Sequence, residues 1–533
     1  MSTEADTVEE LIATAIALHD AGASARAEAV LGRVLAADPD NVLALYGLGR
    51  VLRDTGRAAE ALAPLRRCHD LVPANATVGL SLAVALSDAG RPEDAATLLD
   101  GLLGSAPDAA PQLEEALCAA LAAAGHKAYV EHRFADSAAF YTRLAALRPE
   151  GDGVMGSLGG ALLRAGDPAG AEAALRRALE QAPGDERWLR PLAESVKLQG
   201  RLDEAKALYR RIWTARRASR WWPGPPERGD GSLHTRATLT KLRHDVEQFE
   251  HLAGLGLLPA EAAPSVDALR RLRDAVAAEG RKPTEPFDLT EAQAIAVRDV
   301  YNRIVRLAEP DTGPGPVLNP AVDWRAVEAE FHANTPGFAV IDGLLSPEAL
   351  AALRRYCLES TFWFDLDHAG GYLGAYLSEG FDADLLVAIV RELQQALPDV
   401  LGGRPLRELW AYKYDQRLEG IPPHADEAAV NVNLWIAPDD ACTDPEGGGL
   451  LVYPVEVPRD WRFADYNTIN PKFEAFLRER GSAPRRIAHR QNRAMVFTSK
   501  VVHASERVDF RPGYENRRIN ITLLFGDRRA DGK

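Results

Sequence analysis

A 34-residue period in the first two fifths of the chain constrains the fold more than any other feature of the sequence. Three columns keep this spacing: Gly22, Gly56 and Gly90; Ala27, Ala61 and Ala95; Pro39, Pro73 and Pro107. A glycine can end a helix, a small alanine lets a second helix pack closely, and a proline stops the second helix. The period therefore predicts stacked units of two short helices each, which is an N-terminal α-solenoid.

The register returns after an insertion of eight residues and continues to about Arg217. The later columns are Gly166 and Gly200, Ala171 and Ala205, and Pro149 and Pro183. The intervening repeat carries His132 and Ser137 at the glycine and alanine positions, so six repeats fill residues 1–217. This pattern resembles the tetratricopeptide repeat (TPR), over about residues 8–217. The resemblance implies a concave groove for a protein or peptide partner; repeats that only dimerise the chain or brace a catalytic part are an equal alternative.

Composition excludes several classes of partner. The 533 residues contain 62 Lys and Arg against 77 Asp and Glu, a net charge of −15. Nucleic acid and anionic lipid both require a basic surface, so we expect neither nucleic acid nor membrane as a partner. The four cysteines are far apart, which predicts neither a disulfide framework nor a zinc knot. With an acidic N-terminus and no apolar run of membrane-spanning length, the sequence predicts a soluble, cytoplasmic protein.

The middle of the chain, 218–320, is expected to be a helical connector. Segments rich in proline and glycine, 217–232 and 309–320, interrupt it at both ends. Apolar residues at helical spacing between them predict helices at 235–258, 264–279 and 290–308.

The final third, 321–533, changes to short β runs separated by turn signals. Strands are predicted at 338–345, 406–415, 430–438, 448–455, 493–499 and 519–526. Helices are expected at 346–358 and 382–396. Many short strands of this kind predict a sandwich or jelly roll.

Candidate metal ligands lie on these strands. His424 and Asp426 precede the 430–438 run, and in extended backbone alternate residues share a face, so both side chains point toward one ion. His503 follows the run MVFTSKVV and can complete the set. Two histidines and one carboxylate with open positions are typical of non-haem Fe(II) oxygenases. A His-x-Asp pair alone is weak evidence for a metal site, because such a pair also occurs by chance. Its position beside a predicted strand strengthens the evidence.

The last strand carries a candidate anion site. One face of this strand carries Arg518, Asn520 and Thr522. A buried arginine requires an anionic partner, and a carboxylate can accept two parallel hydrogen bonds from the planar guanidinium group. Asn431 and Asn433 also share a face of their strand, and their partners inside the barrel stay open.

Together, these residues resemble the 2-oxoglutarate and Fe(II)-dependent dioxygenases, over about residues 335–527. The resemblance implies a double-stranded β-helix (a cupin-like jelly roll), with His424, Asp426 and His503 as catalytic iron ligands and Arg518 as the residue that binds 2-oxoglutarate. The arginine usually follows the second histidine by about ten residues; Arg518 is fifteen away, which keeps Arg517 as a rival. Tyr414 resembles a co-substrate-binding tyrosine of the prolyl hydroxylases and is equally consistent with a core aromatic.

The resemblance implies hydroxylation of a C–H bond with Fe(II), 2-oxoglutarate and O2. The family's halogenases lack the carboxylate ligand, whereas Asp426 is present here. The leading hypothesis is a hydroxylase of a protein or peptide side chain that the TPR region recruits. The alternatives are a hydroxylase of a small-molecule or carrier-bound substrate, and a non-catalytic TPR scaffold with a relic barrel.

Overall fold

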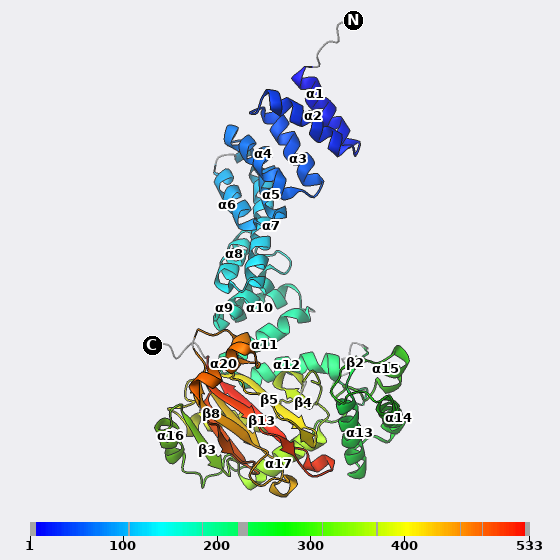
Figure 1. The fold of residues 1–533 in the computed structure, drawn as a ribbon, viewed down its shortest axis with the longest axis vertical. Coiled ribbons are helices and arrows are strands. Elements are labelled where there is room, and N and C mark those ends of the chain that lie inside the picture. The colour runs from blue at the N-terminus through cyan, green and yellow to red at the C-terminus, as the bar shows by residue number, and fades with distance from the viewer. Residues whose placement is uncertain are drawn as a thin grey trace. The chain divides into compact units, whose positions relative to one another are not determined.

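The fold comes from a computed structural model, which describes residues 7–104, 107–183, 185–221, 233–311, 313–368, 371–458, 460–481 and 483–527. The chain forms two compact units, Met1–Ser195 and Val196–Lys533. Figure 1 shows the first as helices alone and the second as sheets with flanking helices.

The first unit consists of helical hairpins, each packed against the next. Its helices are α1 Val8–Asp20, α2 Ser24–Ala37, α3 Val42–Asp54, α4 Ala58–Leu71, α5 Ala76–Asp88, α6 Pro92–Leu103, α7 Ala110–Val130, α8 Phe134–Leu147, α9 Val154–Ala165 and α10 Pro168–Gln181. Helix α11 Leu189–Leu198 runs across the boundary between the units. The eight inserted residues lengthen α7 to 21 residues. The helical solenoid predicted from the 34-residue period is confirmed.

The repeat columns have the structural roles expected of them. Gly56 closes its hairpin with φ at +78°, a left-handed conformation that favours glycine. His132 adopts the same conformation, at φ +61°, in the divergent repeat. Ala61 is fully buried between helices. Ser137, at the alanine position of the divergent repeat, is also fully buried, and its hydroxyl donates to the carbonyl of Gly125 at 2.8 Å.

The second unit begins before the end of the sixth sequence repeat. Its α12, Leu202–Arg217, is the last helix of the predicted 1–217 segment. Asp382 is fully buried beneath it and accepts from Trp213 Nε1 at 3.1 Å and from Arg210 Nη2 at 3.3 Å. A buried carboxylate requires such partners, so these contacts attach α12 to the chain around Asp382.

The predicted connector contains α13 Leu239–Gly254, α14 Ala263–Ala278 and the short α15 Glu291–Val297, with a two-stranded sheet of β1 Arg236–Ala237 and β2 Phe287–Asp288. The helix predicted at 290–308 is wrong beyond Val297. Asn302 adopts a φ of +53°, which a helix cannot hold, and Ile304 bridges Ala218 instead. Of the proposed boundary loop 217–232, residues 222–232 lie outside the described residues.

The remainder is mostly antiparallel sheet. The larger sheet has the order β3 Phe338–Asp342, β10 Arg493–Thr498, β7 Val430–Trp435, β13 Ile519–Phe525, β5 Leu406–Tyr414 and β4 Tyr372–Tyr376. A smaller sheet has the order β11 Val501–Ser505, β8 Leu450–Glu456 and β9 Arg485–Ile487, and β12 Val508–Asp509 pairs with β6 Arg417–Leu418. Flanking helices are α16 Trp324–Ala333, α17 Pro347–Glu359, α18 Asp384–Ala396, α19 Phe463–Tyr466 and α20 Pro471–Arg480. Figure 1 shows α16 beside β3.

All six predicted strands are present, although β8 lies in the smaller sheet. Strands β4, β6, β9, β11 and β12 of this region were not predicted. Apolar side chains of the two sheets form one buried cluster: Phe338, Trp435, Met495 and Phe497 from the larger sheet, with Leu450, Val452, Ile487 and Val501 from the smaller one. The sheets therefore pack face to face, and side chains on their inner faces meet.

Candidate metal centre

The three predicted ligands converge. Ligand atoms of His424, Asp426 and His503 all lie within 4.8 Å of one another. Asp426 Oδ1 is 3.9 Å from His424 Nε2, and Asp426 Oδ2 is 3.4 Å from His503 Nε2. The side chains of His424 and Asp426 are 17% and 14% exposed, so the cluster is accessible from one side.

Backbone pairing brings the ligands together across nearly 80 residues. His424 and His503 form an antiparallel bridge, in which each amide donates to the other's carbonyl at 2.9 Å. The amide of Asp426 donates to the carbonyl of Ser499 at 3.1 Å. The chain turns at Ser499 and Lys500, so His503 lies within the separate strand β11 rather than after one continuous run MVFTSKVV, 495–502.

Carbonyl groups determine the tautomer of both imidazoles. His424 Nδ1 lies 2.9 Å from the carbonyl oxygen of Pro422, and His503 Nδ1 lies 3.0 Å from that of Val501. A carbonyl oxygen only accepts, so each Nδ1 carries the hydrogen. Each ring therefore presents Nε2 as its ligand atom, and both Nε2 atoms face Asp426.

The protonation states also suit a metal site. Burial and then the neighbouring His503 lower the pKa of His424 to about 4. Burial acts to raise the pKa of Asp426, but a hydrogen bond from His503, the charges of the neighbouring imidazoles and a hydrogen bond from Asn431 lower it to about 2. At neutral pH the site thus presents a neutral imidazole beside a carboxylate, the forms in which these groups bind metal.

Two buried side chains hold the carboxylate in place. Asn431 donates from Nδ2 to Asp426 Oδ2, and Ser499 donates its hydroxyl to Asn431 Oδ1. Both Asn431 and Ser499 are fully buried. Sequence reasoning had left the partner of Asn431 open and missed Ser499, which no local signal marks.

A helical insertion supports the ligand loop from behind. Residues 456–485, between β8 and β9, contain α19 and α20. The amide of Ala425, between two ligands, donates to the carbonyl of Tyr466 at 3.0 Å. Ala425 also packs in one buried cluster with Tyr466, Phe473 and Phe476. This packing fixes the loop on its outer side.

The structure separates the two candidate arginines. Arg518 is 1% exposed, donates from Nε to the carbonyl of Gly448 at 2.8 Å, and stacks on the Tyr414 ring at 4.5 Å. Its Nη1 is buried without a hydrogen-bond partner among the described residues. Arg517 instead pairs with Glu247 at 2.9 Å and with Asp415 at 3.2 Å. A buried guanidinium with an unused donor suits an anionic ligand, so Arg518 is the candidate.

Tyr414 is a core aromatic, and its role in binding a co-substrate stays a prediction. It is 1% exposed and belongs to a buried cluster with Val508 and Phe510, and its ring also faces Arg518. Asn520 and Thr522 lie on the face of Arg518 as predicted, with Asn520 Nδ2 donating to Thr522 Oγ1 at 3.0 Å.

Further polar atoms on this face are unused. Within the described part of the chain, Asn433 Oδ1, Asn520 Oδ1 and Trp410 Nε1 are buried without a hydrogen-bond partner. The register places Thr522 opposite both Asn433 and Trp410. Buried polar groups are normally paired, so donors and acceptors on a ligand are expected here.

The fit to a metal rests on the donor set. Two imidazoles and one carboxylate, whose ligand atoms lie within 4.8 Å of one another, match a divalent first-row transition metal with positions left for other ligands. None of the helices in the described ranges is long and apolar enough to cross a membrane.

Comparisons with known proteins match the helical repeats. Two tetratricopeptide repeat family models match residues 12–76 and residues 52–121, 129–194 and 162–223. No curated protein matches the chain. TPR repeats therefore occupy the N-terminal ~220 residues.

Solved TPR structures resemble part of the chain at low identity. A crystallised TPR domain is 18% identical over 39% of this chain and 60% of the other, with a TM-score of 0.21. YrrB, a TPR protein with an unusual peptide-binding site, is 18% identical over 34% of this chain and 90% of the other, with a TM-score of 0.27. A TPR protein from Parabacteroides merdae is 20% identical over 39% of this chain and 79% of the other, also with a TM-score of 0.27.

Proposed function

We propose that the C-terminal unit is a 2-oxoglutarate- and Fe(II)-dependent hydroxylase, whose substrate is a protein or peptide side chain recruited by the TPR region. The observation that carries this proposal is the convergence of His424, Asp426 and His503 in the same unit as a buried arginine with an unused donor. A catalytic iron and a dicarboxylate co-substrate require these two features.

Strand order supports a double-stranded β-helix. Along the chain, β7 lies in the larger sheet, β8 and β9 in the smaller, β10 in the larger, β11 in the smaller and β13 in the larger. Repeated crossing between two packed antiparallel sheets is the property that distinguishes a jelly roll from a meander. The metal ligands lie where the His424 bridge extends the smaller sheet beyond β11.

His424, Asp426 and His503 would hold Fe(II), and the iron with 2-oxoglutarate and O2 supplies the oxidising power for hydroxylation of a C–H bond. The chain's own residues bind and orient. Pro422 and Val501 hold both imidazoles with Nε2 toward the ion, and Asn431 holds the carboxylate. Such orientation by outer groups tunes the metal.

Arg518 would bind the distal carboxylate of the 2-oxoglutarate co-substrate. Its Nη1 supplies an unused donor, and the ring of Tyr414 stacks on the guanidinium and fixes its plane. A charge-assisted hydrogen bond in this dry site is strong, which favours an anion over water.

A protein or peptide substrate follows from the TPR region, since TPR proteins commonly bind such partners in their groove. Protein substrates and small-molecule substrates are separated by the first experiment below.

The full chain, Fe(II) and 2-oxoglutarate should be incubated with a cell extract in air, and the products examined by mass spectrometry. The proposal expects succinate formation and a protein fragment heavier by one oxygen atom; a modified small molecule instead would contradict the substrate class. Under anaerobic conditions, Fe(II) with 2-oxoglutarate should give a weak visible charge-transfer band that His424→Ala abolishes. Absence of the band from folded wild-type protein would contradict the reaction class.

A further inference from the structure

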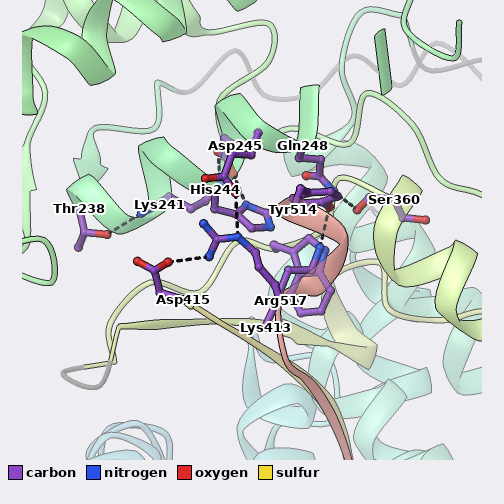
Figure 2. A network of polar contacts seen from close by, with 12 residues as sticks. Thr238, Lys241, His244, Asp245, Gln248, Ser360, Lys413, Asp415, Tyr514 and Arg517 are labelled. Atoms are coloured by element: carbon purple, nitrogen blue, oxygen red, sulfur yellow. Dashed lines mark hydrogen bonds and ion pairs between the residues drawn. The ribbon is translucent and has the colours of Figure 1, made fainter. Parts of the chain in front are cut away.

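A network of mostly buried polar side chains connects α13 with strand β5 and the segment before β13 (Figure 2). Its members come from α13, from β5, and from the segment around η6, Tyr514–Asn516. We refer to it as the α13 cluster, which consists of Lys241, His244, Asp245, Glu247, Gln248, Lys413, Tyr514 and Arg517. Most of these groups are nine-tenths or more buried, so the cluster excludes water.

Tyr514 is the centre of the cluster. Its hydroxyl accepts from Lys413 Nζ at 2.6 Å and from Gln248 Nε2 at 2.9 Å, and donates to the carbonyl of Leu358 at 2.8 Å. These three bonds use the full capacity of a phenolic hydroxyl. Tyr514 lies in the segment that lengthens the spacing from His503 to Arg518, so the added residues provide an anchor.

Arg517 is the second anchor. It is 2% exposed and pairs with Glu247 of α13 at 2.9 Å and with Asp415 at 3.2 Å. Its Nη1 also donates to the carbonyl of Tyr414 at 3.3 Å. Helix α13 is thereby linked, by the ion pair of buried Arg517 with partly exposed Glu247, to the start of β13 and the end of β5.

The anchored residues alternate with the residues of the candidate anion site. Lys413 and Arg517 point to the α13 cluster, whereas Tyr414 and Arg518 point to the opposite face, where the guanidinium stacks on the ring at 4.5 Å. The amide of Tyr414 donates to the carbonyl of Arg518 at 3.0 Å. Neighbouring residues of a strand face opposite sides, so a slip of one residue would exchange the two arginines.

The position of Arg518 makes such anchoring necessary. It directly precedes Ile519, the first residue of β13, and follows the irregular segment around η6. At the end of a strand, backbone hydrogen bonds to the neighbouring strand fix the orientation of a side chain only weakly. A misplaced buried cation has a high free-energy cost, because it loses its partners. Contacts on the opposite face can supply the missing constraint.

We propose that Glu247, Gln248 and Tyr514 are positioning residues, which act from the opposite face of the sheet to hold Arg518 and Tyr414 ready for an anionic ligand. The identity of that anion as 2-oxoglutarate rests on the proposed function. The segment read from sequence as a connector thus belongs to the machinery of the binding site. Asp245, which pairs with Lys241 and lies 2.9 Å from His244 Nδ1, stabilises α13 itself.

The test compares three variants of the full chain. Glu247→Gln removes the charge that faces Arg517, and Tyr514→Phe removes only the central hydroxyl. The matched control is Glu250→Gln, because Glu250 lies on the same helix and pairs with Arg270 at 3.1 Å with both side chains exposed. Each protein is measured for Mn(II) affinity alone, for 2-oxoglutarate affinity with the metal bound, and for turnover, as kcat and as the Michaelis constant for the co-substrate.

Glu247→Gln and Tyr514→Phe should each weaken 2-oxoglutarate binding and raise the Michaelis constant for this co-substrate by about tenfold, the effect of one lost buried hydrogen bond. Mn(II) affinity and kcat should stay within about twofold of wild type, because Arg518 is not a metal ligand. The control should leave all four quantities within the same range. Equal 2-oxoglutarate affinity in the three variants would overturn the proposal. Parallel losses of Mn(II) and 2-oxoglutarate affinity would also overturn it, because they indicate general destabilisation of the protein.

A second measurement keeps the proposal separate from the proposed function. If the wild-type chain fails to bind 2-oxoglutarate, the proposed function is wrong, and amide hydrogen exchange then decides the positioning role. Faster exchange at Tyr414 and Ile519 in Glu247→Gln and Tyr514→Phe than in Glu250→Gln would support it. Equal exchange in all three variants would overturn it.

Discussion

Arg517 and Arg518 are adjacent in the chain, yet their guanidinium groups lie on opposite faces of the six-stranded sheet. Arg517 is neutralised by Glu247 and Asp415, while Arg518 stacks on Tyr414 and retains a buried donor that no described residue uses. The alternation that orients strand side chains thus places one arginine in ion pairs of the fold and leaves the other with a donor that is available to a ligand.

The first prediction concerns Arg518. Replacing it with lysine should weaken 2-oxoglutarate binding by about tenfold or more, because a point charge loses the planar fork and a charge-assisted bond contributes about 1.5–3 kcal/mol. Metal affinity should not change. Calorimetric titration with the metal bound measures the effect, and unchanged 2-oxoglutarate affinity would assign the anion to another residue.

The second prediction concerns the metal ligands. His503→Ala and Asp426→Ala should each lower Mn(II) affinity by more than about 100-fold, since changes to outer groups alone cost about 10- to 100-fold. The matched control is His489→Ala: His489 is also buried, but its Nε2 lies 3.2 Å from the carbonyl of Ala437 and outside the triad. Equal losses in control and ligand variants would contradict the assignment.

The third prediction concerns the support of the carboxylate. Asn431→Ala and Ser499→Ala should each weaken Mn(II) binding by about tenfold, because Asp426 then loses a donor directly or through Asn431. The two losses should not add in the double variant, since the residues form one chain of hydrogen bonds. The control variant is Asn433→Ala, on the same face of β7, which should leave metal affinity unchanged. Strictly additive losses in the double variant would contradict the hydrogen-bonded chain from Ser499 through Asn431 to Asp426.

The fourth prediction concerns the TPR helices. A Cβ at Gly156 would meet the Trp188 ring at 2.2 Å, whereas a Cβ at Gly160, one turn along α9, has no neighbour within 4 Å. Gly156→Ala should therefore lower the free energy of unfolding by about 1–3 kcal/mol. Gly160→Ala should raise it by about 0.5–1 kcal/mol through helix propensity. Chemical denaturation measures both, and effects of equal sign would contradict the packing.

The fifth prediction is a pH dependence. Hydrogen bonds from Arg493, at 2.5 and 2.9 Å, lower the pKa of Asp342 and join β3 to β10. A lowered folded-state pKa gives stability that is present above the unfolded value of about 3.9 and is lost as the pH falls through the folded value. Asp342→Asn should thus cost at most about 1 kcal/mol at pH 7, since the carboxylate is half exposed. The difference should disappear in acid; a constant difference down to about pH 2 would exclude the ion pair.

The parts that sequence predicted correctly depend on local requirements. Gly56 ends a helix, and Ala61 lies where two helices pack closely. Each requirement concerns a single position and recurs in every repeat. The six predicted strands follow from residues that alternate between buried faces. The direction of His424 and Asp426 follows from the same alternation.

Only the tertiary structure distinguished the contacts of the two arginines and brought Ser499, α19 and α13 to their places around these residues. The partner of Arg517 lies 270 residues away in Glu247, and Ser499 reaches Asn431 across 68 residues. The period and spacing of residues predict which face of a helix or strand a side chain occupies. They carry no information about which distant residues pack against that face. Contacts between distant segments form only when the sheets and helices pack, and these contacts leave the Arg518 guanidinium with an unused donor.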